Sequence, residues 1–538
     1  MKNFSIFAML FAALATSAAP LKIGWAIADV STDKPIFTVG LDYRRNSQGL
    51  RDPITVTALV IDNGEDFVVF NSWDTCVVNP KCAERIRAEV AKKLPGFPTE
   101  KIIFNAIHNH TGPALGEWYR DPLSNWYREM FIEKTAGAIV EAWNNRKPGK
   151  IGFGYDFAVT CFSRRPVYFD DLSKRPPAKG KNLWRIVPGL QVDKYARVHG
   201  NSNDPMFSHM EAAPDPFVNF LFTYDMNDKL TGMIFNIAFP TQVSLPDKKL
   251  GSDCWSDIRR ELKKEFGDGV YVLPQCAAAG DLTYKIPYYY KATERKHRLR
   301  YGRKEKFPGE FERKRCTEQM MAALHRTLPW ASKALYDDLP LRHIKTTLKL
   351  PRFYASPEHI EEGKILLAKL NEMEKNPPWD TSDPAFVKKA NDFMATARRR
   401  INNMLTLNEQ IKKKPTWDME FHVLRIGEVA FVSEHYELYT DYGQRIQARS
   451  PFTQTFTIQL SVGGFGYLPT ARSLKNAGYQ SHPINNYNSP SPEGGQMMVD
   501  EAVRLLYELK GETEPPCPAS AQPVPRAKTT PLTGEDLK

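Results

Sequence analysis

The spacing of apolar and polar positions in the first fifth of the chain predicts four strands and one helix. Apolar runs of strand length are separated by polar turns, and one pair of runs flanks Asp62-Asn63-Gly64, which is a hairpin signal. One segment instead has apolar positions at helical spacing. The predicted strands are 21–31, 54–60, 67–70 and 101–107, and the helix is 80–93. This order is typical of an α/β layer with polar residues at its strand ends.

The spacing of apolar and polar positions also predicts helices and strands over the rest of the chain. Helices are predicted at 129–144, 254–266 and 497–509, and strands at 217–224, 230–238, 270–273, 421–426, 429–432 and 455–460. Residues 163–215 are rich in Pro and charge and predict a long surface excursion that builds pocket walls. A charged, mostly helical insertion is expected over about 291–415, with its clearest helices at 358–374 and 385–407. The predicted fold class is mixed α/β, a large mixed-sheet domain with this insertion packed on it.

The two ends of the chain differ in composition from the middle. Residues 1–19 combine Lys2, a short apolar core and small residues, a pattern that predicts a secretory signal peptide. We expect one catalytic domain over 20–511 and a disordered Pro-rich tail over 512–538. No later stretch is apolar enough to cross a membrane, so the mature protein is expected to be secreted or periplasmic.

Charge and cysteine content exclude several classes of protein. The net charge is +11, and eleven Lys and Arg against four Glu lie in 291–315. No nucleic-acid motif accompanies this run, so we interpret it as a solvated helix face and expect no nucleic-acid partner. The seven cysteines form no CxxC pair, which argues against a disulfide scaffold. Cys76 and Cys82 could close a small loop, or could be free buried thiols.

The strongest candidate site follows the predicted strand 101–107. The sequence there is Asn105-Ala106-Ile107-His108-Asn109-His110-Thr111-Gly112-Pro113. On an extended segment both imidazoles would project from one face, because side chains alternate. They could share one metal, or one could bind it while the other contacts substrate. The alternative is a pair of hydrogen-bonded histidines without a catalytic role.

Seven short segments, in order along the chain, resemble motifs of the neutral (non-lysosomal) ceramidase family. The H-x-H segment resembles H-T-H-S-G-P, and Ala278-Ala279-Gly280-Asp281-Leu282-Thr283 resembles A-A-G-D-x-S. The others are Gly24 to Ser31, Gly49 with Arg51 and Ala58, Ser252-Asp253, Glu437 with Gly443-Gln444-Arg445, and Gly466 to Thr470. The resemblance implies that family's catalytic domain. We expect its C-terminal immunoglobulin-like domain to be missing.

The resemblance also implies a zinc ion held by two His, a Glu and a Tyr. Carried over by position, the metal ligands present are His108 and Glu437. Phe239 stands where the second His is expected, and Gly464 where the Tyr is expected. Because Phe cannot bind zinc, three outcomes stay open. The ion could be held by His108, His110 and Glu437 with Asp74, Asp253 or Asp281; the chemistry could be metal-free; or catalysis could be lost.

Further candidates for catalysis and binding come from the same segments. Asp281 follows Gly280 at a tight turn and could bind metal, orient an imidazole or cap the turn. Thr283 stands where the resemblance implies a nucleophilic Ser, and we take it with His110 and Asp281 as candidate catalytic residues. Arg164, Arg165 and Tyr467 are candidate substrate contacts.

Two functions follow from this sequence. The first is a secreted, metal-assisted hydrolase of an amide (N-acyl) or related bond. The second is a non-catalytic binding protein on the same scaffold. Aromatic residues in the excursions would also suit a carbohydrate-derived substrate; they are Trp118, Trp184, Tyr288, Tyr289 and Tyr290. We favour the hydrolase because both H-x-H histidines, Asp281 and Glu437 are retained.

Overall fold

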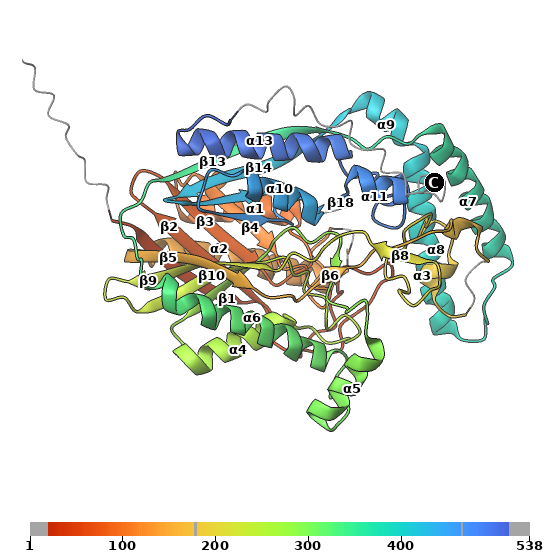
Figure 1. Ribbon diagram of the computed structural model, residues 1–538, viewed down its shortest axis with the longest axis horizontal. Helices are drawn as coiled ribbons and strands as arrows, with labels where there is room; N and C mark the ends of the chain where they lie inside the picture. Colours follow the sequence, from red (N-terminus) through yellow and green to blue (C-terminus); the bar gives the residue numbers. More distant parts are fainter. Residues whose placement is uncertain (1–19, 118, 120, 177–179, 464–465, 516–538) are drawn as a thin grey trace, which may run out of the picture.

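The computed structural model describes residues 20–515 except 118, 120, 177–179 and 464–465 (Figure 1). The predicted signal peptide, nearly all of the predicted tail, Trp118 and Gly464 therefore lie outside the described residues. Within them, no helix is long and apolar enough to cross a membrane.

The largest element is a mixed sheet of eight strands. Its order is β11-β10-β9-β5-β1-β2-β3-β4, and only β3–β4 and β10–β11 pair in parallel. All eight residues of β2 are buried, because both faces of the sheet are covered. The strands are β1 Lys22–Asp29, β2 Thr55–Asp62, β3 Phe67–Trp73, β4 Ile102–Ala106, β5 Lys147–Phe157, β9 Phe217–Asp225, β10 Leu230–Ile237 and β11 Tyr271–Cys276.

A second sheet of four strands packs face to face on the first. Its order is β13-β14-β15-β17, with strands β13 Leu341–Pro351, β14 Thr416–Ile426, β15 Val429–Ser433 and β17 Gln454–Ile458. The core between the sheets is apolar and includes the rings of Phe70, Phe431 and Phe456. The Phe70–Phe431 and Phe431–Phe456 ring centroids are 4.9 and 4.4 Å apart. The two sheets therefore form a sandwich, which fixes the position of each strand end.

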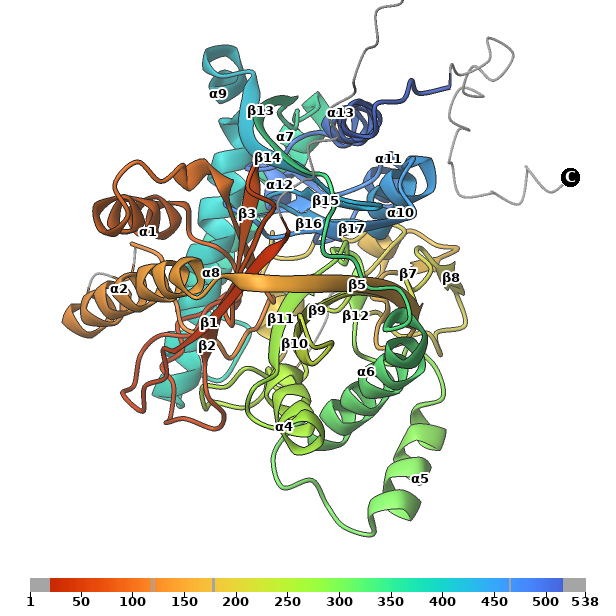
Figure 2. The same ribbon diagram turned by 90° about the vertical axis from the view of Figure 1, so that its left-hand side faces the viewer.

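Helices cover both outer faces of this sandwich (Figure 2). On the main sheet, α1 Pro80–Lys93 and α2 Pro122–Asn144 pack near β1 and β2, while α4 Cys254–Phe266 and α6 Glu310–Ala331 pack near β5 and β9. On the second sheet, α10 Thr440–Arg449 and α13 Pro492–Lys510 form the cover. The helix starts follow capping chemistry: the Asn79 side chain accepts from Cys82 N, and Pro80 occupies the first turn of α1.

The long segments between these elements gather at one end of the molecule (Figure 1). There, the hairpin of α7 Pro357–Lys375 and α8 Pro384–Leu405 packs on the excursion that contains α3 Leu183–Ile186. The remaining helices are α5 Tyr290–Tyr301, α9 Leu407–Lys413, α11 Ala471–Asn476 and α12 Pro483–Asn486, with 3-10 turns at Thr99–Lys101 and Leu172–Lys174. Three short pairs complete the fold: β6 Phe162–Ser163 with β12 Leu282–Thr283, β7 Pro166–Tyr168 with β8 Phe207–Met210, and β16 Glu437–Leu438 with β18 Tyr467–Leu468.

The predicted fold class is confirmed, while the expected helical insertion over 291–415 differs in two respects. The segment contains β13, an edge strand of the second sheet, and α6 packs on the main sheet. The exposed positions of β13 are polar and lie on both faces of the strand: Arg342 on one, and Lys345, Thr347 and Lys349 on the other. The six described cysteines, including Cys76 and Cys82, are buried free thiols.

Candidate active site

His108 lies where the first sheet ends, and its backbone departs from a strand. β4 ends at Ala106, and His108 has a φ of 62°, in the left-handed region. The expected alternation, which would put both imidazoles on one face of a strand, is therefore wrong. The rings of His108 and His110 still adjoin, edge to face, with centroids 5.0 Å apart.

Both ring nitrogens of His108 contact oxygen atoms. Nδ1 lies 3.0 Å from the carbonyl oxygen of Cys76, and Nε2 lies 3.0 Å from Oε2 of Glu437. Burial is the largest single effect and would lower the pKa of His108, but Glu437 and Cys76 together outweigh it, and the pKa lies well above its ordinary value. His108 and Glu437, both expected as metal ligands, are therefore hydrogen-bonded to each other at a strand end.

Glu437 is positioned by backbone contacts on both sides. Its N–H donates to the carbonyl oxygen of Gly466 at 2.9 Å, within the β16–β18 pair. On the other side, Gly280 N donates to the Leu438 carbonyl at 2.7 Å, and a Cβ at position 280 would come within 2.3 Å of the Glu437 carbonyl oxygen. Gly280 is thus required for this close approach, and the A-A-G-D segment sets the place of the carboxylate.

Arg164 supplies a second positive charge next to Glu437. Its Nη2 donates to the Gly280 carbonyl at 3.0 Å and lies 3.8 Å from Glu437 Oε2. Its guanidinium also lies over the ring of Tyr467, 5.2 Å from the centroid. Burial, with the Glu437 carboxylate, holds the pKa of Tyr467 well above its ordinary value. Arg164 and Tyr467, both expected as substrate contacts, are therefore brought to the same carboxylate.

His110 adjoins this pair and is held from two sides. Its Nε2 lies 3.1 Å from the Gln242 amide nitrogen, and the ring also hydrogen-bonds the Gly40 backbone. Burial, with the positive charges of His108 and Arg164, lowers the pKa of His110 well below its ordinary value. The ring is therefore neutral at pH 7 and keeps one lone pair.

Three other predicted site residues make contacts of a different kind. Asp281 accepts from the Thr440 backbone N–H at 3.0 Å and from its hydroxyl, at the start of α10. The Thr283 hydroxyl, in β12, lies 3.4 Å from the backbone N–H of Lys285. Arg165 has a fully buried side chain and forms an ion pair with Glu211. The geometry thus gives Arg165 a structural contact where a substrate contact was expected.

The four-ligand zinc site implied by the resemblance does not fit the described residues. Phe239 is 1% exposed and belongs to the hydrophobic core beside α4 and α6, so it cannot serve as a ligand. The alternative carboxylates are engaged elsewhere: Asp74 pairs with Arg259, and Asp253 accepts from Ser244 N. Of the four ligands that the resemblance implies, only His108 and Glu437 are found among the described residues.

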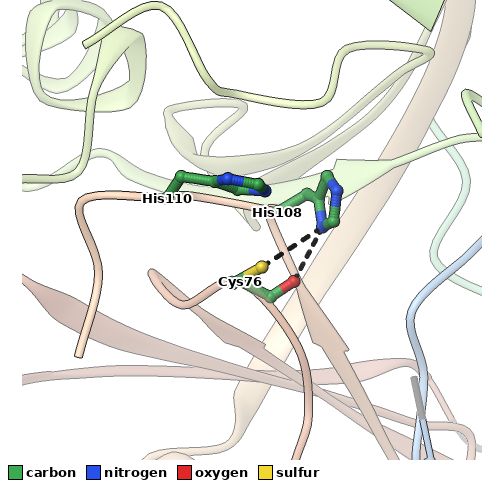
Figure 3. Close-up of side chains that lie close together, drawn as sticks. All are labelled: Cys76, His108 and His110. Carbon is green, nitrogen blue, oxygen red and sulfur yellow. Dashed lines mark hydrogen bonds between the residues drawn. The ribbon is translucent and has the colours of Figure 1, made fainter. Parts of the chain in front are cut away.

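A different group of possible metal ligands includes His108, and one of its members is not among the ligands predicted from the sequence. Cys76, His108 and His110 could together hold a metal ion, because their ligand atoms lie within 4.8 Å of one another (Figure 3). The sequence alone indicates for Cys76 either a small disulfide loop or a free buried thiol, and the structure has the thiol. The available signal was its place a few residues after a strand that runs parallel to β4, since such strands end at the same sheet edge.

The architecture matches solved structures. One, described as a crystal structure analysis of neutral ceramidase from Pseudomonas aeruginosa, aligns over 93% of this chain and 76% of that chain, with a TM-score of 0.57 and 14% identity. Another, described as ceramidase complexed with C2, aligns over 94% of this chain and 78% of that chain, with a TM-score of 0.57 and 15% identity. The chain has a neutral ceramidase-like fold.

The sequence carries only a weak trace of this neutral ceramidase-like fold. No protein-family model matches the chain, and no curated protein matches it. The short motifs noted above, in their order, are what the sequence retains of the fold. The residues that they carry to the ends of two different sheets, His108 and Glu437, meet in the structure.

Proposed function

We propose that this protein is a hydrolase that cleaves the amide bond of an N-acyl substrate. The observation that carries the proposal is the carboxylate of Glu437, 11% exposed, held between the His108 imidazole and the Arg164 guanidinium. A carboxylate oriented in this way, in a largely water-excluded site, can act as a general base. The fold supports a hydrolase of this kind, and no step below passes through a metal.

Each proton in the reaction has a place on this constellation. Glu437 takes a proton from water, and the resulting hydroxide attacks the carbonyl carbon of the amide. Arg164 stabilises the negative charge that develops on the carbonyl oxygen. Glu437 then returns the proton to the amide nitrogen as the C–N bond breaks, which yields a carboxylic acid and an amine. The acid then passes its proton to the amine, so the products leave as a carboxylate and an ammonium ion. His108 keeps Glu437 in position throughout, because its Nε2–H donates to Oε2.

A row of aromatic rings beside Arg164 suits the rest of the substrate. Trp184 and Tyr479 have ring centroids 5.2 Å apart, and Tyr479 and Tyr467 have centroids 5.9 Å apart. All three side chains are half-buried, so each keeps part of its ring exposed. Such a row can pack an acyl chain or stack on a sugar ring. Tyr289, also considered for stacking, is instead 79% exposed at the start of α5.

The proposal is tested with Glu437→Gln, which removes the base and keeps the size of the side chain. We expect kcat to fall about 10²- to 10⁴-fold with little change in melting temperature. Glu409→Gln is the control, because the Glu409 side chain is 70% exposed in α9 and should tolerate the change. Two amides are assayed by release of free amine: a short-chain N-acyl amino alcohol and an N-acetyl amino sugar.

Preference between the two amides assigns the substrate class. Calorimetry could show that the wild-type protein binds one of the compounds while neither compound releases amine. That result would refute hydrolysis and favour a binding protein. Equal activity of the wild type and Glu437→Gln would refute the assigned base.

A further inference from the structure

Cys76 and His108 are spaced as two ligands of one metal ion would be. The Cys76 Sγ and His108 Nδ1 atoms are 3.6 Å apart, and both side chains are buried. With zinc–sulfur and zinc–nitrogen bonds of about 2.3 and 2.0–2.1 Å at a tetrahedral angle, two such atoms should be about 3.6 Å apart. The observed distance equals that value.

His110 supplies the third donor. One nitrogen of its ring lies within 4.8 Å of the ligand atoms of Cys76 and His108. Figure 3 shows the His110 ring beside that of His108, on the side where Cys76 lies. Thiolate and imidazole are the donors that zinc and similar borderline ions prefer.

The second nitrogen of the His108 ring faces a carboxylate, as is common for histidines that bind a metal. Metal-binding histidines commonly donate their second N–H to a carboxylate, which fixes the ring and raises its basicity. Here Nε2 faces Glu437 Oε2 at 3.0 Å, on the ring edge opposite Cys76. In the absence of metal, Nδ1 is 3.0 Å from the Cys76 carbonyl oxygen, and binding of an ion would replace that hydrogen bond.

We propose that Cys76 Sγ, His108 Nδ1 and His110 bind a zinc-type divalent ion, with Glu437 outside the ligand set. Three protein ligands leave a tetrahedral ion one open position, which is typical of reactive rather than structural zinc. This set differs from the one that the resemblance implied, in which Glu437 itself binds the metal. The proposal concerns metal binding alone and does not depend on the proposed amide hydrolysis.

The test is the absorption spectrum and metal content of the full chain after metal removal and reloading with Co²⁺ or Zn²⁺. Wild-type protein should bind one Co²⁺ and show a thiolate-to-cobalt charge-transfer band in the near ultraviolet. Cys76→Ala should lose that band and most zinc affinity. Glu437→Gln should keep the band and bind zinc 10- to 100-fold more weakly, as expected for loss of a carboxylate behind a ligand.

Cys82→Ala is the matched control, because Cys82 is an equally buried free thiol, in α1, that should leave the spectrum unchanged. The opposite pattern, in which Cys76→Ala binds zinc normally and Glu437→Gln does not, would overturn the proposal. So would a wild-type cobalt complex without the thiolate band, a result that does not depend on how well any variant folds.

Discussion

Asp281→Asn should change how the stability of the protein depends on pH. Asp281 is 2% exposed, and its burial raises its pKa from 3.8 to about 6. Below pH 4 the carboxyl group is protonated in both the folded and unfolded chain. Between pH 4 and 6 the unfolded chain ionises first, so folding loses stability as pH rises; above pH 6 the loss is complete.

The size of this loss follows from the pKa difference. A difference of about 2 corresponds to roughly 3 kcal/mol of folding free energy. Asparagine cannot ionise, and its amide oxygen can still accept from the Thr440 N–H, which Asp281 contacts at 3.0 Å. Relative to wild type, Asp281→Asn should therefore gain about 3 kcal/mol between pH 4 and pH 7.

The measurement is urea denaturation followed by tryptophan fluorescence at pH 4, 5, 6 and 7. Asp268→Asn is the control, because the Asp268 side chain is 77% exposed and its replacement should follow the wild-type pH profile. A difference between Asp281→Asn and wild type that stays constant from pH 4 to pH 7 would show that the buried carboxyl group is not held protonated in this range.

Two further substitutions test the packing around the site. Gly280→Ala should reduce activity at least 10-fold, because its Cβ would lie 2.3 Å from the Glu437 carbonyl oxygen. Gly137→Ala is the control: this residue lies in α2, where the new Cβ would meet no atom of another element within 4 Å. It should stay active and gain up to about 1 kcal/mol of stability. Equal activity of the two variants would contradict the close approach. Arg165→Met should lower the free energy of unfolding by about 3–5 kcal/mol, measured in urea, because it leaves Glu211 buried and unpaired; a loss below about 1 kcal/mol would mean that the pair is not desolvated.

The elements whose signals are local could be predicted from the sequence. The predicted helices 80–93 and 254–266 have the same bounds as α1 and α4, because a capping side chain and an amphipathic run mark each of them. β13 is not predicted because its exposed Lys and Arg residues resemble those of the charged helices around it, and its partner β14 begins only at Thr416. Strand pairing over such a distance leaves no local pattern.

The site was predictable in part for the same reason. His108 and Glu437 each stand in a short motif at a strand end, so their meeting could be expected. The left-handed backbone of His108 could not, because a non-glycine residue adopts it only when surrounding contacts require it. Nor could the sequence separate Arg164 from Arg165: neighbouring residues point to opposite sides, and packing decides that one reaches Glu437 and the other Glu211.

The meeting of His108 and Glu437 ties the chemistry of the protein to the completion of its folding. The two residues belong to opposite halves of the chain: His108 follows β4 of the main sheet, and Glu437 lies in β16, shortly after β15 of the second sheet. Contacts between residues so far apart in sequence form late, because loop-closure entropy must first be overcome. A nascent or partly folded chain can therefore hold the histidine without its carboxylate. The pair of side chains proposed for catalysis is therefore complete only when β16 lies against the end of the main sheet.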